Sequence, residues 1–326
     1  MEQLLMERCE QFAENKEALR TGFKLEHTAM YALCAIVCGN KKVNIQRIKD
    51  CKKIIKEQTS VFSTFRSHTF LVLATMLSLE DDPQSRMADI LDTYSVFKKN
   101  KFWGSDFLAL SSFLIRETDH ERKQWLVEKS REIYKLAKEN HPFLTASEDY
   151  GYTVMLALSE QSAKDAILET EHCYDFLKNH FLSKDAVQSL SFVLALGTDT
   201  AEEKCDKAMR IFETLKQNGY KYGTGYELPG LGVLTLSANN EDQTVANVMG
   251  VYDYLKTQKG FGSLAMGRAQ RVLFASALTV QDAVSGDTVL NTTLTNTVTN
   301  IIIAIEIALM AAVVASTAAV TSSSNS

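Results

Sequence analysis

Apolar and polar residues alternate along this chain with the spacing of α-helices, and the predicted helices come in pairs. The clearest pair lies in 173–196, where one helix ends, a short loop follows and a second helix begins. Other helices are predicted at 3–17, 22–38, 84–99, 104–116, 119–140, 201–217, 244–257 and 264–280. The pattern predicts an all-α protein of about 12–15 antiparallel helices.

One short pattern recurs along the chain at nearly constant spacing. An aromatic residue is followed by lysine four positions later, so that both lie on one helical face. The five copies are separated by 40, 40, 38 and 40 residues and begin at Tyr94, Tyr134, Tyr174, Phe212 and Tyr252. We call these the register aromatics. Each is followed by a further aromatic residue a few positions on, as in Phe102 and Phe181.

Such a period predicts a particular way of building the core. A helical pair of about 40 residues cannot bury its apolar face alone, but stacked pairs bury it for one another. We therefore expect antiparallel αα-hairpin repeats, stacked as an α/α superhelix or toroid. Because no Pro/Gly/Ser-rich linker divides the chain, residues 1–320 are predicted to be a single domain.

The C-terminal segment 301–320 is almost entirely apolar and is long enough to cross a bilayer. Glu306, many small residues and the lack of flanking Lys or Arg favour a terminal helix packed against the rest of the protein. Membrane association through this helix is the alternative. Residues 321–326 are predicted to be a disordered tail.

The composition narrows the classes of function. The formal net charge of −5 gives no reason to expect a nucleic-acid partner. The N-terminus is charged from Glu2 onward and does not resemble a signal peptide. Six scattered cysteines within helical patterns are typical of reduced thiols, so a cytoplasmic protein is expected.

Two groups of residues in the sequence are candidate binding sites. His27, Tyr31, Cys34 and Cys38 share one helical face and are candidate zinc ligands, but a buried apolar stripe accounts for them better. The basic stretch 41–58 is interpreted as a solvated helix face, since it lacks aromatics that would stack on bases. No metal and no cofactor is predicted.

The starts of the second helices in alternate pairs carry polar and titratable side chains, which form a candidate cleft. If the pairs curve toward one another, these starts converge and bring titratable side chains to one mouth. The alternative interpretation is a set of independent helix caps and surface charges. The candidate residues, together with a histidine at a neighbouring helix boundary, are Arg66, His68, His141, Glu148, Asp149, Tyr226 and Glu227.

Several longer strings resemble a known family. The strings are 141–149 (HPFLTASED), 186–196 (AVQSLSFVLAL), 219–228 (GYKYGTGYEL) and 258–262 (QKGFG). They resemble a family of uncharacterised bacterial proteins, domain of unknown function family 4003. The resemblance spans nearly the whole chain and implies a single helical module in the cytoplasm, with no activity, ligand or catalytic residue to carry over.

Three functions follow as hypotheses. The first is a non-enzymatic interaction or scaffold module that binds a protein or peptide on a concave face, an inference by analogy of architecture. The second is an enzyme or small-ligand binder that uses the candidate cleft. The third is a membrane-associated protein held by 301–320. The sequence favours the first, names no catalytic residue and leaves the oligomeric state open.

Overall fold

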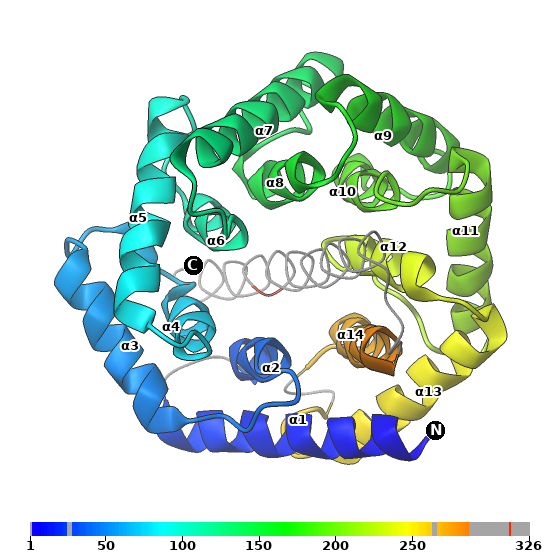
Figure 1. The fold of residues 1–326 in the computed structure, drawn as a ribbon. Helices are drawn as coiled ribbons and strands as arrows, with labels where there is room; N and C mark the ends of the chain where they lie inside the picture. Colours follow the sequence, from blue (N-terminus) through cyan, green and yellow to red (C-terminus); the bar gives the residue numbers. More distant parts are fainter. Residues whose placement is uncertain (1, 25–27, 263–265, 287–312, 314–326) are drawn as a thin grey trace, which may run out of the picture. The chain divides into compact units, whose positions relative to one another are not determined.

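The computed structural model describes residues 2–24, 28–262, 266–286 and 313, and in these residues every regular element is helical (Figure 1). The all-α prediction is confirmed for this part of the chain. The predicted terminal helix 301–320 lies, apart from Val313, outside the described residues, and so does the tail 321–326. No helix in the described ranges combines the length and apolar character needed to cross a membrane.

The chain divides into two compact units, which we describe separately. The central unit is Lys41–Ile167, and the terminal unit joins Met1–Asn40 to Leu168–Ser326. The expected single domain over 1–320 stays a prediction.

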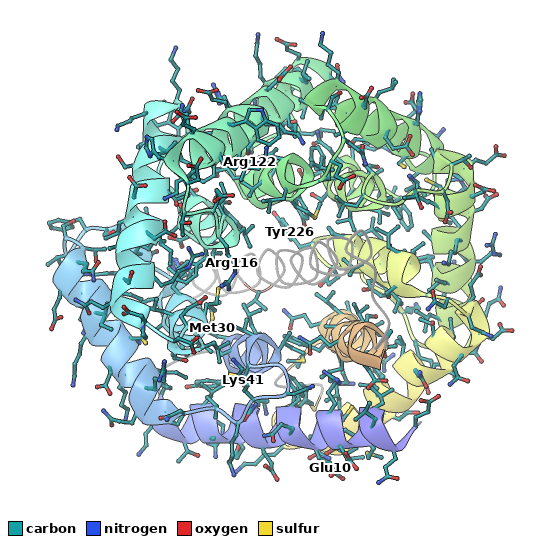
Figure 2. All side chains as sticks on the ribbon, viewed as in Figure 1. Glu10, Met30, Lys41, Arg116, Arg122 and Tyr226 are labelled. Carbon is teal, nitrogen blue, oxygen red and sulfur yellow. The ribbon has the colours of Figure 1, made fainter. Side chains whose placement is uncertain are left out.

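The central unit contains three helical pairs. Its elements are α3 (Ile45–Gln58), the 3-10 helix η1 (Thr64–Arg66), α4 (Phe70–Ser78), α5 (Pro83–Lys99), α6 (Asp106–Leu114), α7 (His120–Asn140), the 3-10 helix η2 (Ser147–Asp149) and α8 (Tyr150–Leu158). The longer first helices α3, α5 and α7 pack side by side, and each contacts its own shorter second helix. Figure 2 shows polar side chains on the faces of the first helices that are turned away from α4, α6 and α8.

The terminal unit brings together helices from both ends of the chain. It contains α1 (Gln3–Gly22), α2 (Thr28–Val37), most of α9 (Ala163–Leu177), α10 (Lys184–Leu194), α11 (Ala201–Gln217), α12 (Leu228–Ser237), α13 (Glu241–Thr257) and α14 (Arg268–Gly286). The second helices α10, α12 and α14 pack in sequence, while α1 packs against α13 and α14. Helix α1 continues to Gly22, past the predicted end at residue 17, because Leu19 is fully buried.

Local chemistry explains where the first helices begin. A side-chain oxygen accepts a hydrogen bond from a backbone amide of the first turn, which satisfies a donor that has no partner within the helix. Asn44 does this for α3 and Asp119 for α7. At α11, Thr200 and Glu203 bond reciprocally in a capping box. These short polar residues separate one apolar helix from the next.

At one end of the central unit, cationic side chains cap the C-terminal ends of the second helices. Arg47 Nε donates to the Ser78 carbonyl at 2.7 Å, and Arg86 Nη2 donates to the Phe113 carbonyl at 2.7 Å. Lys129 Nζ donates to the Ser159 carbonyl, also at 2.7 Å. Each cation lies on the first helix of a pair and meets the last carbonyls of the second helix, where positive charge is favourable. We call this the cap end.

At the other end, aromatic rings join successive pairs. This end, where α3, α5 and α7 finish and α4, α6 and α8 begin, is called the loop end. Phe65 packs on the register aromatic Tyr94 with ring centroids 5.1 Å apart, and Phe102 packs on Tyr134 at 6.1 Å. In both cases a ring that follows one first helix contacts the next first helix.

The terminal unit contains the same kind of contact. Phe181 packs on Phe212 with centroids 5.1 Å apart, and Tyr220 packs on Tyr252 at 5.1 Å. Phe261, which follows α13, contacts Phe12 of α1 at 5.6 Å. The helix at the start of the chain therefore receives an aromatic contact from the loop after α13.

Candidate functional site

Arg66, at the end of η1, is bonded to the end of α3. Its Nε donates to Thr59 Oγ1 at 3.0 Å, and its Nη2 donates to the carbonyls of Lys56 and Thr59. The guanidinium thus satisfies backbone acceptors that the helix leaves open. This placement holds the α3–α4 loop in position.

His68 is paired with an acid that the sequence comparison did not select as a site residue. Its Nδ1 lies 3.6 Å from the Asp106 carboxylate, at the start of α6. Burial raises the pKa of Asp106 above its ordinary value, while hydrogen bonding from Ser67 and the charge of His68 oppose this rise. His68 itself is exposed, so the pair lies at the surface of the central unit.

The loop after α7 carries His141, Glu148 and Asp149. His141 ends the helix, and its carbonyl accepts from the amide of Leu144 at 3.2 Å. Asp149 is buried and accepts from the amide of Ala146 at 2.9 Å, while Glu148 is half-buried. The Asp149 carboxylate therefore bonds within its own turn, as a capping acid does.

Tyr226 and Glu227 lie in the terminal unit, whereas the other five candidates lie in the central unit. Tyr226, labelled in Figure 2, is 48% exposed just before α12. The Glu227 carboxylate folds over Gly223, where an added Cβ would collide with it. Convergence of the candidates on one mouth stays a prediction.

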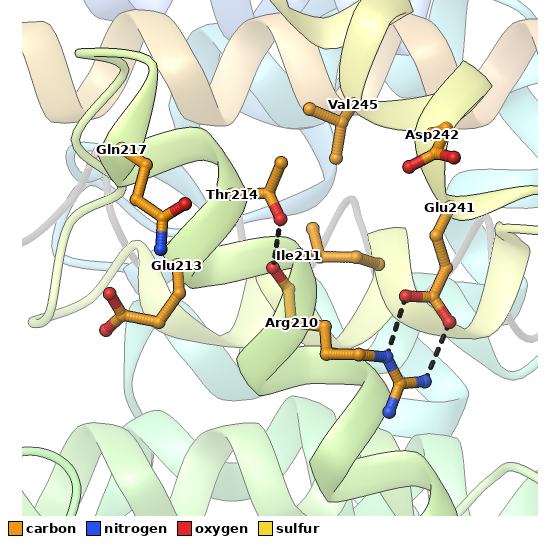
Figure 3. Close-up of a pocket in the computed structure, with 8 residues that line it drawn as sticks. All are labelled: Arg210, Ile211, Glu213, Thr214, Gln217, Glu241, Asp242 and Val245. Atoms are coloured by element: carbon orange, nitrogen blue, oxygen red, sulfur yellow. Dashed lines mark hydrogen bonds and ion pairs between the residues drawn. The ribbon is translucent and has the colours of Figure 1, made fainter.

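A hollow between α11 and α13 was not predicted from the sequence. It has a volume of about 290 Å³, and Figure 3 shows its lining from both helices. Ile211 and Val245 supply apolar surface between the helices. The polar residues around them are Arg210, Glu213, Thr214, Gln217, Glu241 and Asp242.

One side of this hollow is held by an ion pair. Arg210 Nε lies 3.0 Å from Glu241 Oε2, and its Nη2 lies 2.7 Å from Oε1, a bidentate arrangement (Figure 3). Hydrogen bonding from Arg210 lowers the pKa of Glu241 below its ordinary value. Glu213 is paired with Lys216 at 3.0 Å. Of the carboxylates that line the hollow, Asp242 has no ion pair among the described residues.

A comparison with known protein families identifies the family of this chain. The family model described as "Protein of unknown function (DUF4003)" matches residues 11–308. The chain belongs to this family. The resemblance seen in the sequence is therefore confirmed, and it reaches over nearly all of the described helices.

One relative among the known proteins is named as uncharacterised. The DUF4003 chain is 24% identical over 258 residues to "Uncharacterized protein YeaA" of Bacillus subtilis (strain 168). The match covers 77% of this chain and 76% of that protein. No solved structure matches the chain.

The cysteines of this DUF4003 protein are placed as buried thiols. None of the six forms a disulfide and all are buried, and Cys34 and Cys38 lie within or next to α2. Burial raises the pKa of Cys38 to about 12, which disfavours the thiolate that metals bind. His27, the imidazole of this stripe, lies outside the described residues. Within the described ranges, no group of three or more His, Cys, Asp or Glu side chains is arranged to hold a metal ion.

The sequence indicates some of the residues that line the hollow between α11 and α13, but not that they come together. Glu241 and Asp242 are visible as acids in a first turn, and Arg210 as a cation on a helix. That Arg210 and Glu241 meet depends on how α11 packs on α13, because 31 residues separate them. No local sequence pattern predicts a contact between two residues so far apart in the chain.

Proposed function

We propose that this DUF4003 protein is a non-enzymatic interaction module that binds a protein or peptide, and that its helical pairs are copies of one repeated structure. The recurring contact between a loop aromatic and the next register aromatic supports the repeat within each unit. A stacked superhelix or toroid is the arrangement that such a repeat favours. Binding on a concave face stays a prediction.

The observation that carries the proposal is the hollow between α11 and α13. Two first helices lie side by side, with Ile211 and Val245 as an apolar floor and charged residues at the margin. A groove of this kind suits an extended or helical peptide that places one apolar side chain on the floor. The Asp242 carboxylate adds a preference for a lysine or arginine next to that side chain.

Selection of a displayed random-peptide library on the wild-type chain tests this function. We expect recovered peptides to combine an apolar residue with a neighbouring cation. Fluorescence anisotropy of a recovered peptide then compares wild type with Asp242→Lys. Like-charge contact should weaken binding about tenfold or more.

The matched control is Glu202→Lys. Glu202 is exposed in the first turn of α11, as Asp242 is in the first turn of α13, but it does not line the hollow. Both changes cost a similar small amount of helix stability. Equal loss of binding in the two variants, or no enrichment of cationic peptides, would contradict the proposal.

The second hypothesis, a small-ligand or enzymatic site at Arg66, His68, His141, Glu148, Asp149, Tyr226 and Glu227, stays a prediction. Membrane association through 301–320 also stays a prediction, because that segment lies outside the described residues apart from Val313.

A further inference from the structure

The loop end of the central unit exposes apolar side chains from all three of its loops. Phe62 is 98% exposed in the α3–α4 loop, Trp103 is 79% exposed in the α5–α6 loop, and Phe143 is 98% exposed in the α7–α8 loop. Val61, next to Phe62, is 74% exposed. Large apolar residues exposed in consecutive loops at one end of a unit mark a contact surface.

These loops lie at the same end because α3, α5 and α7 run side by side, with α5 in the middle (Figure 1). The first loop contacts the end of α5 through Phe65 and Tyr94. The second loop contacts the start of α8, where the Trp103 amide donates to the Tyr150 hydroxyl at 3.3 Å. The three loops that carry the exposed rings therefore follow one another at this end of the unit.

Exposed lysines lie at the same end of the unit as these rings. The exposed lysines at the loop end include Lys56, Lys98, Lys99 and Lys101. Lys98, Lys99 and Lys101 surround the loop of Trp103, and in the described residues none of them forms an ion pair. Carboxylates are present as well, since Glu57 and Glu139 are exposed at the ends of α3 and α7 and Glu148 is half-buried near Phe143.

The cap end of the same unit combines both signs of charge, since the cations Arg47, Arg86 and Lys129 lie there. It carries carboxylates before the first turns of α5 and α7 and within the first turn of α7, namely Glu80, Asp81, Asp82, Glu117, Asp119 and Glu121. Acids are expected there because they complement the positive ends of the helix dipoles. The helix dipole also favours lysine at the loop end, but it does not explain why aromatic rings are exposed to water there.

Lys101 occupies a conformation that a lysine rarely adopts. Its φ is +64°, and it is the only non-glycine residue with positive φ in the described chain. The amide of Phe102 bonds to the Phe97 carbonyl at 3.2 Å, a helix ending in which glycine is the usual residue. A side chain at this position costs stability, and here it carries a positive charge two residues before Trp103.

We propose that the loop end of the central unit binds the surface of an anionic lipid bilayer. Phe62, Trp103 and Phe143 would enter the interfacial layer, where aromatic side chains are stable. The lysines around Trp103 would contact lipid phosphates, and each cation near an anionic surface adds to the attraction.

A bilayer suits this edge better than a protein partner. Protein contacts gain most of their energy from side chains packed in pockets, and residues that are 98% exposed, as Phe62 and Phe143 are, lie in no groove of the chain. A fluid lipid surface needs no such pocket, because each ring enters it independently. This inference concerns the central unit and does not depend on the peptide proposed for the α11–α13 hollow.

Tryptophan emission provides the first test. The chain has two tryptophans, so Trp125→Phe leaves Trp103 as the single reporter. This protein is titrated with vesicles of phosphatidylcholine mixed with phosphatidylglycerol, and with vesicles of phosphatidylcholine alone. We expect a blue shift of Trp103 emission with the anionic vesicles only.

Co-sedimentation with the same vesicles provides the second test. Lys98→Gln, Lys99→Gln and Lys101→Gln together should weaken binding about 100-fold, from about fivefold for each lysine. The control removes the same number of positive charges from the cap end, by Lys42→Gln, Arg122→Gln and Lys164→Gln. It should leave binding within about twofold, because these side chains lie away from the rings. Circular dichroism verifies that both variants are folded.

The outcomes separate clearly. A blue shift with anionic vesicles, lost in the loop-end variant and kept in the cap-end variant, supports the proposal. Unshifted Trp103 emission, equal binding to neutral vesicles or equal loss in both variants overturns it. A protein captured through these rings by a chain that ignores anionic vesicles also overturns it, in favour of a protein interface.

Discussion

The α5–α6 loop of the central unit and the α11–α12 loop of the terminal unit end their first helices in the same way. In the first, Lys101 has φ +64° and the amide of Phe102 bonds to the Phe97 carbonyl; in the second, Gly219 has φ +86° and the amide of Tyr220 bonds to the Leu215 carbonyl. Lys101 and Gly219 each follow their register aromatic, Tyr94 or Phe212, by seven residues.

The two loops differ in the side chains placed on this shared backbone. The first carries a lysine at the left-handed position and an exposed tryptophan two residues later, whereas the second carries glycine and then Lys221 at the corresponding positions. Phe102 and Tyr220, between them, both pack on the register aromatic of the following pair. The comparison separates a structural position, filled by an aromatic in both loops, from positions that are free to serve a partner.

The largest expected effect comes from the shared structural position. Phe102→Ala should lower the free energy of unfolding by about 3–5 kcal/mol, because the ring is 2% exposed and contacts Phe97, Tyr134 and Tyr150. Trp103→Ala, one residue away, should change it by only about 0.5 kcal/mol. Chemical denaturation of the two variants measures both values. Similar losses in the two would remove the distinction between structural and free aromatics.

An intermediate effect is expected from exchanging the residues at the left-handed position. Lys101→Gly should raise the free energy of unfolding by about 0.5–1 kcal/mol, while Gly219→Ala should lower it by about 1 kcal/mol. No atom lies within 4 Å of a Cβ added at Gly219, so backbone conformation alone accounts for that loss. Thermal unfolding followed by circular dichroism shows whether each substitution raises or lowers the stability. If Lys101→Gly were destabilising, the lysine would be structural and would not support the bilayer proposal.

The smallest effect concerns the pH dependence of the two loops. The Tyr220 hydroxyl donates to Asp253 at 2.7 Å, and this hydrogen bond raises the pKa of Tyr220 to about 12. Because the folded state holds this proton more tightly than the unfolded state, the contribution to stability is complete below pH 10 and is lost as pH rises toward 12.

Tyr220→Phe should therefore reduce the pH dependence of unfolding between about pH 10 and 12, by less than about 1 kcal/mol. Trp103, in the α5–α6 loop, has no such proton and is 79% exposed, so Trp103→Phe should leave this pH dependence as it is in the wild type. Urea unfolding at successive pH values compares the three proteins. An unchanged slope in Tyr220→Phe would show that the bond to Asp253 does not couple to folding.

Much of the architecture could be predicted because its causes are local. Helices α5, α7, α11 and α13 follow from apolar spacing and from the polar caps before them, which lie within a few residues of the effects they produce. The register aromatics are visible in the sequence by their nearly constant spacing, and Tyr94, Tyr134, Phe212 and Tyr252 each contact a ring from the preceding loop.

The contacts between helices needed the folded chain. Lys123 is buried between Asp89 and Asp92 at 2.7 and 2.8 Å, and Lys204 is buried against Glu169 at 2.5 Å. A lysine with an acid more than 30 residues away has no distinctive spacing. Arg66 lies near a helix start in the sequence, and no local pattern indicates that it bonds to the end of α3.

By itself, the sequence determined the helical class, the pairing of helices and the positions of the aromatic residues that recur from pair to pair. Those properties depend on hydrogen bonds and apolar faces within one helix or between neighbours in the chain. The tertiary structure decided which of two adjacent rings, Phe102 or Trp103, is covered and which faces solvent. That choice depends on where α7 and α8 lie, because Tyr134 and Tyr150, together with Phe97 of α5, pack on the Phe102 ring and exclude water from it.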